Sequence, residues 1–141
     1  MTIAVVVFPG TNCELDIQHA LRMSGASAEL VWHRDTDLSG ANGIVLPGGF
    51  AHGDYLRTGA IARFSPVMSE VERLAHIGVP ILGICNGFQI LCEAGLLPGV
   101  LMRNSGLKYI CRDIHLRVAS TDSVFTQGYA KDQILRIPIA H

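Results

Sequence analysis

Cys85 is the residue of this chain best suited to nucleophilic chemistry, because of the residues on either side of it. The apolar run at 79–82 predicts a buried strand, and residues 88–95 have helical spacing. Glycines at 83 and 87 flank the cysteine and permit a sharp turn between strand and helix. This G-x-C-x-G pattern predicts a nucleophile elbow that exposes a thiolate at a helix N-terminus, where the helix dipole stabilises negative charge. A buried, inert cysteine is the alternative.

The backbone near Cys85 could stabilise the oxyanion that forms when a thiolate attacks an acyl carbon. The N–H of Asn86 directly follows the nucleophile and is expected to donate to that oxygen. Gly48 and Gly49 follow a strand expected at 43–47, and the carboxyl ends of parallel strands meet at one edge of a sheet. We therefore expect the Gly-Gly turn to lie at the same edge as Cys85, where its N–H groups could form the second half of an oxyanion hole. An ordinary strand-to-loop turn is the alternative for this pair.

The elements that position these turns follow a regular order. Short apolar runs alternate with segments of helical spacing over the first hundred residues, which is typical of βαβ units. We predict an α/β fold, a three-layer α/β/α sandwich with a mostly parallel, flavodoxin-like sheet, in one domain at 1–141. Strands are expected at 3–8, 28–32, 43–47 and 79–82, and helices at 13–24, 56–64, 66–77 and 88–95. A small antiparallel extension is expected after residue 100, with strands at 112–118, 123–125 and 133–139.

Several side chains carry expectations that the structure can test. Thr11 or Asn12 is expected to cap the first helix, and Leu15 and Met23 to belong to its apolar stripe. In the helix after Cys85, Phe88 and Leu91 fall on one apolar face. The polar segment 33–37 is expected to be a solvated loop.

Composition narrows the classes of protein that this chain can represent. Its 141 residues are 49% hydrophobic and 16% charged, with a net charge of −1 and no basic stripe, so nucleic acid is not an expected partner. No apolar run is long enough for a membrane span, and the N-terminus lacks the basic region of a signal peptide. The four cysteines form no C-x-x-C pair and the six histidines are dispersed, which predicts a cytoplasmic protein without a metal site.

Several motifs resemble one family. Residues 83–89 (GICNGFQ) resemble the nucleophile motif of class I, triad-type glutamine amidotransferases, and residues 46–50 (LPGGF) resemble the oxyanion-strand motif of that family. Three segments are similar to the glutaminase subunits of phosphoribosylformylglycinamidine synthases, enzymes of purine biosynthesis: 8–16 (FPGTNCELD), 48–59 (GGFAHGDYLRTG) and 137–141 (IPIAH). The resemblance therefore extends over the whole chain.

The resemblance implies a specific reaction. Cys85 would attack the side-chain amide of L-glutamine, ammonia would leave, and water would hydrolyse the glutamyl thioester to glutamate. Gly49 and Asn86 would hold the oxyanion, while Gly48 and Gln89 would help to bind the substrate. Ammonia would pass to a synthetase subunit that uses ATP and magnesium, so this chain is expected to bind no cofactor itself. For Gln89, the alternative is a helix residue that satisfies local polar groups.

One departure from the family concerns the general base. The family uses a histidine in a His-Pro-Glu motif, and no His-x-Glu occurs in this chain. The resemblance places His141 in a family segment that precedes the catalytic His-Pro-Glu motif. The amidotransferase domain is therefore expected to be C-terminally incomplete. Glutamine turnover by this chain alone is then expected to be impaired, because general-base help is worth roughly 10²–10⁴-fold in rate.

Three other functions compete with this interpretation. The first is a cysteine hydrolase of the DJ-1/PfpI type, in which His52, His115 or His141 would supply the base. The second is a non-catalytic binding module that uses the elbow to dock a partner. The third is an amidotransferase that supplies a different synthetase.

Overall fold

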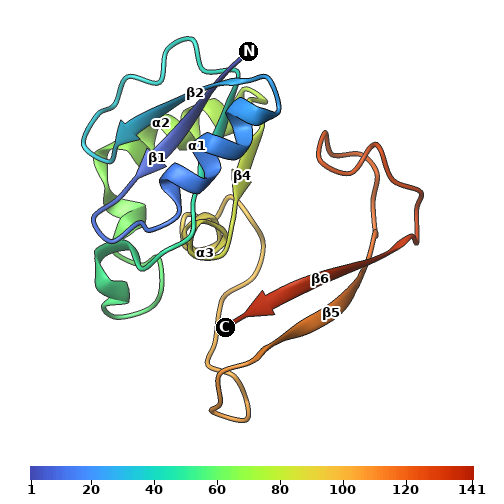
Figure 1. Cartoon of the computed structure of the whole chain (residues 1–141). Helices are drawn as coiled ribbons and strands as arrows, with labels where there is room; N and C mark the ends of the chain where they lie inside the picture. The colour runs from blue at the N-terminus through green and yellow to red at the C-terminus, as the bar shows by residue number, and fades with distance from the viewer. The chain divides into compact units, whose positions relative to one another are not determined.

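A four-stranded parallel sheet forms the centre of the larger of two compact units. The computed structural model describes all 141 residues, and its units are residues 1–101 and 102–141. The sheet contains β1 (Thr2–Val7), β2 (Ser27–Trp32), β3 (Gly43–Leu46) and β4 (Ile81–Gly83), in the order β2-β1-β3-β4 (Figure 1). This is the flavodoxin-like order. The predicted parallel α/β fold is therefore confirmed.

The pairing of β3 with β4 places the two turns of interest side by side. Leu46, the last residue of β3, is in register with Gly83, the last residue of β4. The Ile84 N–H extends this pairing by donating to the Leu46 carbonyl at 3.0 Å. The chain segments that follow the two strands consequently leave the sheet at neighbouring points.

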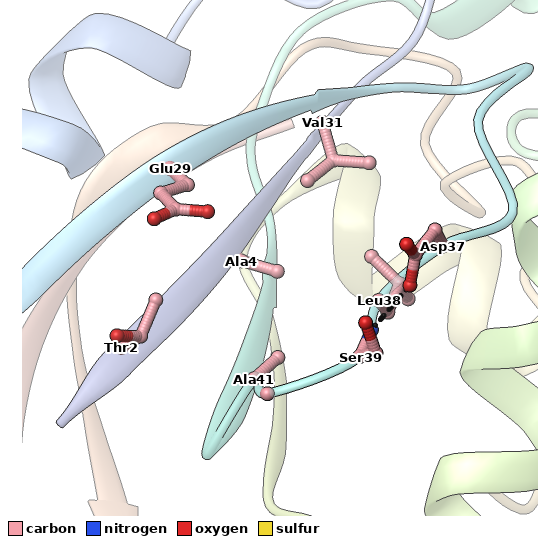
Figure 2. Close-up of a pocket in the computed structure, with 9 residues that line it drawn as sticks. Thr2, Ala4, Glu29, Val31, Asp37, Leu38, Ser39 and Ala41 are labelled. Carbon is pink, nitrogen blue, oxygen red and sulfur yellow. Dashed lines mark hydrogen bonds between the residues drawn. The ribbon is translucent and has the colours of Figure 1, made fainter.

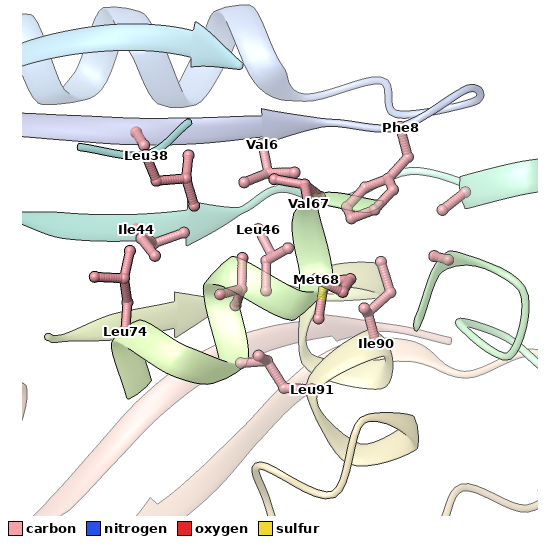
Figure 3. Close-up of a cluster of buried hydrophobic side chains, with 14 residues drawn as sticks. Val6, Phe8, Leu38, Ile44, Leu46, Val67, Met68, Leu74, Ile90 and Leu91 are labelled. Atoms are coloured by element: carbon pink, nitrogen blue, oxygen red, sulfur yellow. The ribbon is translucent and has the colours of Figure 1, made fainter. Parts of the chain in front are cut away.

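Helices cover both faces of the sheet, as a buried parallel sheet requires. The helix α1 (Glu14–Met23) contacts β1 and β2 on one face, whereas α2 (Pro66–His76) and α3 (Asn86–Glu93) pack on the other. Figure 3 shows side chains of the strands pointing into the layer that α2 and α3 form. The core cluster comprises Ala4, Val6, Phe8, Leu38, Ile44, Leu46, Ala51, Ala62, Val67, Met68, Val71, Leu74, Ile90 and Leu91. Full burial of a valine, leucine, isoleucine, phenylalanine or methionine side chain stabilises the folded state by about 1.5–3 kcal/mol.

The expectations for the first helix were wrong in two respects. Its N-cap residue is Cys13, without a side-chain capping bond, and the Thr11 hydroxyl instead accepts the Phe8 N–H at 2.9 Å within the preceding turn. Leu15 and Met23 are 63% and 77% exposed. The stripe that touches the sheet is rotated around the helix, and its half-buried members are Glu14, Ile17, Gln18 and Leu21.

The helix expected at 56–64 is also absent. The chain instead forms two short 3-10 segments, η1 (Ala51–Asp54) and η2 (Ala62–Phe64), separated by turns. Within this range, left-handed φ values at Leu56 (70°) and Gly59 (80°) are incompatible with an α-helix. Apolar spacing alone predicted the wrong element here, and Leu56 is 90% exposed.

The second unit is a two-stranded antiparallel ribbon. It contains β5 (Cys111–Arg117) and β6 (Ile134–Ala140), paired from Cys111↔Ala140 to Arg117↔Ile134. The antiparallel extension is therefore confirmed, but residues 123–125 form a turn instead of the expected strand. No helix of the chain combines the length and the apolar character that crossing a membrane would need.

Candidate active site

Cys85 occupies a sharp turn between β4 and α3, and the residue is exposed. Its φ of 52° and ψ of −111° are rare for a residue with a side chain and cost on the order of 1–3 kcal/mol. The Gln89 N–H donates to the Cys85 carbonyl at 3.2 Å, so the helical hydrogen-bond pattern begins at once. The predicted strand, turn and helix are all present. This strained backbone presents the thiol at the carboxyl edge of the sheet.

The two flanking glycines permit this turn by their lack of side chains. A Cβ at Gly83 would lie 2.7 Å from the backbone of Gly87, and a Cβ at Gly87 would lie 1.9 Å from the Leu46 carbonyl oxygen. Both distances are too short for non-bonded atoms. The steric role that the sequence predicted for these glycines is therefore confirmed.

The turn after β3 lies directly against Cys85. The position of a Cβ on Gly48 would be 3.4 Å from the Cβ of Cys85. Gly49 forms an isolated antiparallel bridge with Thr11, and a Cβ on Gly49 would lie 2.6 Å from the Asn12 nitrogen. The turns after β3 and β4 thus meet at one edge of the sheet, as predicted, and the turn after β1 joins them there. Among the hydrogen bonds within the chain, none is donated by the Gly49 or Asn86 N–H.

The Asn86 side chain connects the nucleophile turn to the segment after Gly49. It is 2% exposed, and its Oδ1 accepts the Ala51 N–H at 2.9 Å. Its Nδ2 donates to Asp54 Oδ1 at 3.1 Å and to Gln89 Oε1 at 3.0 Å. The Gln89 oxygen is therefore engaged within the protein, and its Nε2 is the group left to meet a ligand.

Two ionisable groups of this region were missed by the sequence reasoning. Burial raises the pKa of Asp54, and the hydrogen bond from Asn86 opposes that rise. Burial also raises the pKa of the Cys13 thiol, followed by the effects of Asp16, Cys85 and Glu14. Asp54 and Cys13 lie within motifs noted in the sequence, but no local pattern gave either residue a role.

Two further expectations were wrong in part. Phe88 is 43% exposed, although its neighbour on the same predicted face, Leu91, is buried in the core. The loop expected at 33–37 is exposed at 34–37, as predicted, but His33 is 7% exposed. The helical period was right, but the width of the face that α3 buries and the depth of the loop after β2 depend on packing.

A shallow hollow lies away from Cys85. It has a volume of about 200 Å³ and is lined by residues of β1, β2 and the segment 37–41, where Thr2, Glu29 and Asp37 contribute polar groups (Figure 2). This is the opposite end of the parallel strands from Cys85. Nowhere in the 141 residues do three His, Cys, Asp or Glu side chains gather closely enough to hold a metal ion.

Comparisons with known proteins agree with the site. A family model described as a CobB/CobQ-like glutamine amidotransferase domain matches residues 1–141. Two relatives from Rhodopseudomonas palustris strains, each called phosphoribosylformylglycinamidine synthase subunit PurQ, are 59% and 57% identical over 143 residues. These alignments cover 100% of this chain and 61% of each relative. The chain thus spans about three-fifths of the length of these curated relatives.

A solved structure is also similar. In the structure titled PurLQS from Thermotoga maritima, one chain matches with a TM-score of 0.92 and 46% sequence identity, covering 99% of this chain and 66% of that one. Together with the family match, this agreement favours the amidotransferase interpretation over a hydrolase of the DJ-1/PfpI type.

Proposed function

Because this chain belongs to the CobB/CobQ-like glutamine amidotransferase domain family, we propose that it is the glutamine-hydrolysing part of a phosphoribosylformylglycinamidine synthase. The observation that carries the proposal is the strained Cys85 elbow beside the Gly48-Gly49 turn. The relatives named as subunits of that synthase match over the whole of this chain. Their names support the placement of the reaction in purine biosynthesis.

The proposed reaction uses Cys85 as the nucleophile. Its thiolate attacks the carbonyl carbon of the glutamine side-chain amide and forms a tetrahedral intermediate with a negatively charged oxygen. Collapse of the intermediate breaks the carbon–nitrogen bond, and the nitrogen leaves as ammonia after gaining a proton. Attack by water on the resulting thioester then releases glutamate and restores the thiol.

Backbone N–H groups would stabilise the oxyanion. The Asn86 N–H lies next to the nucleophile, the Gly49 N–H comes from the facing turn, and neither donates to an acceptor in the chain. One such donor contributes on the order of 3 kcal/mol to transition-state stability. Gly48, which adjoins the Cys85 side chain, and the Gln89 amide would contact the substrate, the latter at its amino-acid end.

The general base is assigned to no residue of this chain. The His52 ring already contacts Ser65, and no His-x-Glu sequence occurs among the 141 residues. We therefore expect slow glutamine turnover by this polypeptide alone. The ammonia would be used by a synthetase subunit that binds ATP and magnesium. The four cysteines of the chain are free thiols, which fits a reducing, cytoplasmic setting.

Covalent labelling tests the proposal. The 141-residue protein is incubated with 6-diazo-5-oxo-norleucine, a glutamine analogue, and its intact mass and peptide map are measured. We expect one adduct, on Cys85, that is absent in Cys85→Ala and present in the matched control Cys92→Ala. A titratable Cys85 thiol that forms no adduct would contradict the proposal.

A further inference from the structure

A buried polar cluster lies in the first unit, outside the residues assigned to the reaction. The Ser65 Oγ lies 3.1 Å from His33 Nδ1 and 3.3 Å from His52 Nε2. Ser65 and His33 are each 7% exposed. The two imidazole rings meet edge to face at 5.2 Å, and Phe8 packs near both. A hydroxyl can donate to one ring nitrogen and accept from the N–H of the other ring, so Ser65 provides a partner for one nitrogen of each imidazole.

The Ser65 side chain does not cap α2, although Ser65 stands at the N-cap position of that helix, with φ −64° and ψ 142°. The His33 carbonyl instead accepts the Val67 N–H at 3.0 Å and so satisfies that free donor of the helix. His33 thereby frees the Ser65 hydroxyl to face the two rings.

The other end of the cluster is a strained segment. His52 has a left-handed φ of 54°, and Gly53 and Asp54 follow with 73° and 52°. Such values are unfavourable for residues with a side chain and persist where surrounding contacts hold them. His52 has two such contacts, its ring bond to Ser65 and its N–H bond to the Pro9 carbonyl at 2.6 Å.

The same segment holds the residue next to the nucleophile. The Ala51 N–H and the Asp54 carboxylate both bond to the Asn86 side chain, which is buried directly after Cys85. A continuous series of contacts therefore runs from Ser65 through residues 51–54 to Asn86. Residues 51–54 supply two of the three side-chain bonds of Asn86, and the third is to Gln89, so displacement of His52 is expected to weaken the two bonds from this segment.

We propose that Ser65 and His33 are positioning residues, which hold residues 51–54 in the strained form that orients Asn86 beside Cys85. The positioning of the loop stands on the contacts alone. Its consequence for glutamine chemistry rests on the function proposed above, in which the Asn86 N–H stabilises the oxyanion. Neither residue is assigned contact with the substrate.

Hydrogen exchange of the 141-residue protein tests the positioning directly. Ser65→Ala removes the hydroxyl without removing a capping bond, and Ser65→Thr restores a hydroxyl. The control, Ser69→Ala, removes an exposed hydroxyl of the same helix that bonds only to the Pro66 carbonyl. We expect amide exchange in peptides covering 50–57 and 84–90 to rise about tenfold in Ser65→Ala and to stay near wild type in the other two variants.

Labelling kinetics test the consequence for the site. The rate of Cys85 alkylation by 6-diazo-5-oxo-norleucine is expected to fall roughly tenfold in Ser65→Ala, while alkylation by iodoacetamide changes little. An unchanged rate with iodoacetamide is a result that a loss of general stability would not produce, and Ser65→Thr is expected to recover the wild-type rate with the glutamine analogue. His52→Asn provides a second variant, because asparagine tolerates the left-handed backbone but is too short to reach Ser65.

The outcomes separate this inference from the proposed function. Wild-type exchange at 50–57 in folded Ser65→Ala or His52→Asn would overturn the positioning role. An exchange rise with no labelling of the wild-type protein by the glutamine analogue would support the positioning role and count against the glutaminase function. An exchange rise with unchanged labelling kinetics would overturn the link from the loop to the nucleophile.

Discussion

The two units of this chain form sheets by different means. In residues 1–101, helices enclose a parallel sheet, and most of the strand side chains of β1 and β3 are buried. In residues 102–141, two antiparallel strands pair along seven positions, yet Val118 is the only buried apolar residue of that unit. The first unit is stabilised mainly by burial, and the second mainly by its hydrogen-bond ladder.

This difference bears on where a strained site can exist. Left-handed φ values also occur in the second unit, at Leu107 (51°) and Asp132 (65°), but the combination of φ 52° and ψ −111° at Cys85 lies outside that region and needs surroundings that make other conformations more costly. The covered sheet supplies those surroundings through close packing. A two-stranded ribbon is only marginally stable by itself in water. Accordingly, every residue assigned here to the candidate site belongs to the first unit.

The largest contrast is expected from adding one methyl group to each unit. Gly87→Ala places a Cβ against the Leu46 carbonyl oxygen, whereas Gly128→Ala meets nothing within 4 Å. We expect Gly87→Ala to lower the free energy of unfolding by about 3 kcal/mol or more, because the backbone at the elbow must shift. Denaturant unfolding measures both variants. Equal, small effects would show that the elbow is less tightly packed than described.

Removing a large side chain sharpens the same comparison. Met68 is 1% exposed within the core, while Ile134 on β6 is 57% exposed. Met68→Ala is expected to cost about 2–5 kcal/mol, because it leaves a cavity between α2 and the sheet. Ile134→Ala is the control, with an expected loss of about 0.5 kcal/mol or less. A comparable loss in both variants, measured by urea unfolding, would count against the contrast.

The next effect in size is expected from acid, which should lower the stability of the first unit through the buried His33. Burial lowers the pKa of His33 from its ordinary 6.5, and His52 and Arg34 lower it further, whereas Asp35 raises it. Below pH 6.5 the unfolded chain therefore binds a proton more readily than the folded chain, so stability falls as pH falls through the folded pKa.

The matching variant is His33→Gln. We expect it to be less stable than wild type at neutral pH and to lose less stability between neutral pH and the acid side of 6.5. Unfolding at a series of pH values measures both properties, with the exposed His115→Gln on β5 as the control. An unchanged pH slope in His33→Gln would refute the assignment of this acid sensitivity to His33.

The smallest effects are expected from arginine ion pairs. Arg57 binds both carboxylate oxygens of Glu93, at 2.9 and 2.8 Å, and the Glu93 side chain is 7% exposed. Arg117 pairs with Asp132, whose side chain is 58% exposed. Arg117→Gln is expected to change stability by less than about 1 kcal/mol, since solvent and salt screen the pair.

Arg57→Gln is expected to lower the denaturation midpoint more than Arg117→Gln does, because it leaves a largely covered carboxylate without its cation. Both midpoints are measured at low and high salt. If salt changed the midpoint shift of Arg57→Gln more than that of Arg117→Gln, this difference in screening would be contradicted.

Local sequence patterns predicted the parts of the site that depend on backbone geometry. The apolar runs identified the strands, and Gly83 and Gly87 indicated a turn that a Cβ would obstruct. The parallel order then implied that Gly48 and Cys85 would meet. These predictions succeeded because strand formation and steric exclusion act between residues close in sequence or at matching strand ends.

Other features could not be predicted from local patterns. Residues 56–64 have apolar spacing compatible with a helix, but in the folded chain they form turns and a short 3-10 segment. His33 was expected to be a solvated loop residue, because its hydrogen-bond partner Ser65 is 32 positions away and no local pattern connects the two. Asn86 was expected to contribute its N–H, and its side-chain bonds to Ala51 and Asp54 span 35 and 32 positions.

The sequence by itself thus determined the parallel core, the position of the cysteine turn and the glycines that permit it, because these follow from periodicity and from the space that a side chain occupies. Only the tertiary structure decided the rotation of α1, the exposure of Phe88, the path of residues 51–64 and the cluster of Ser65 with two histidines. Those features depend on free-energy differences among contacts between distant residues, which no local pattern records.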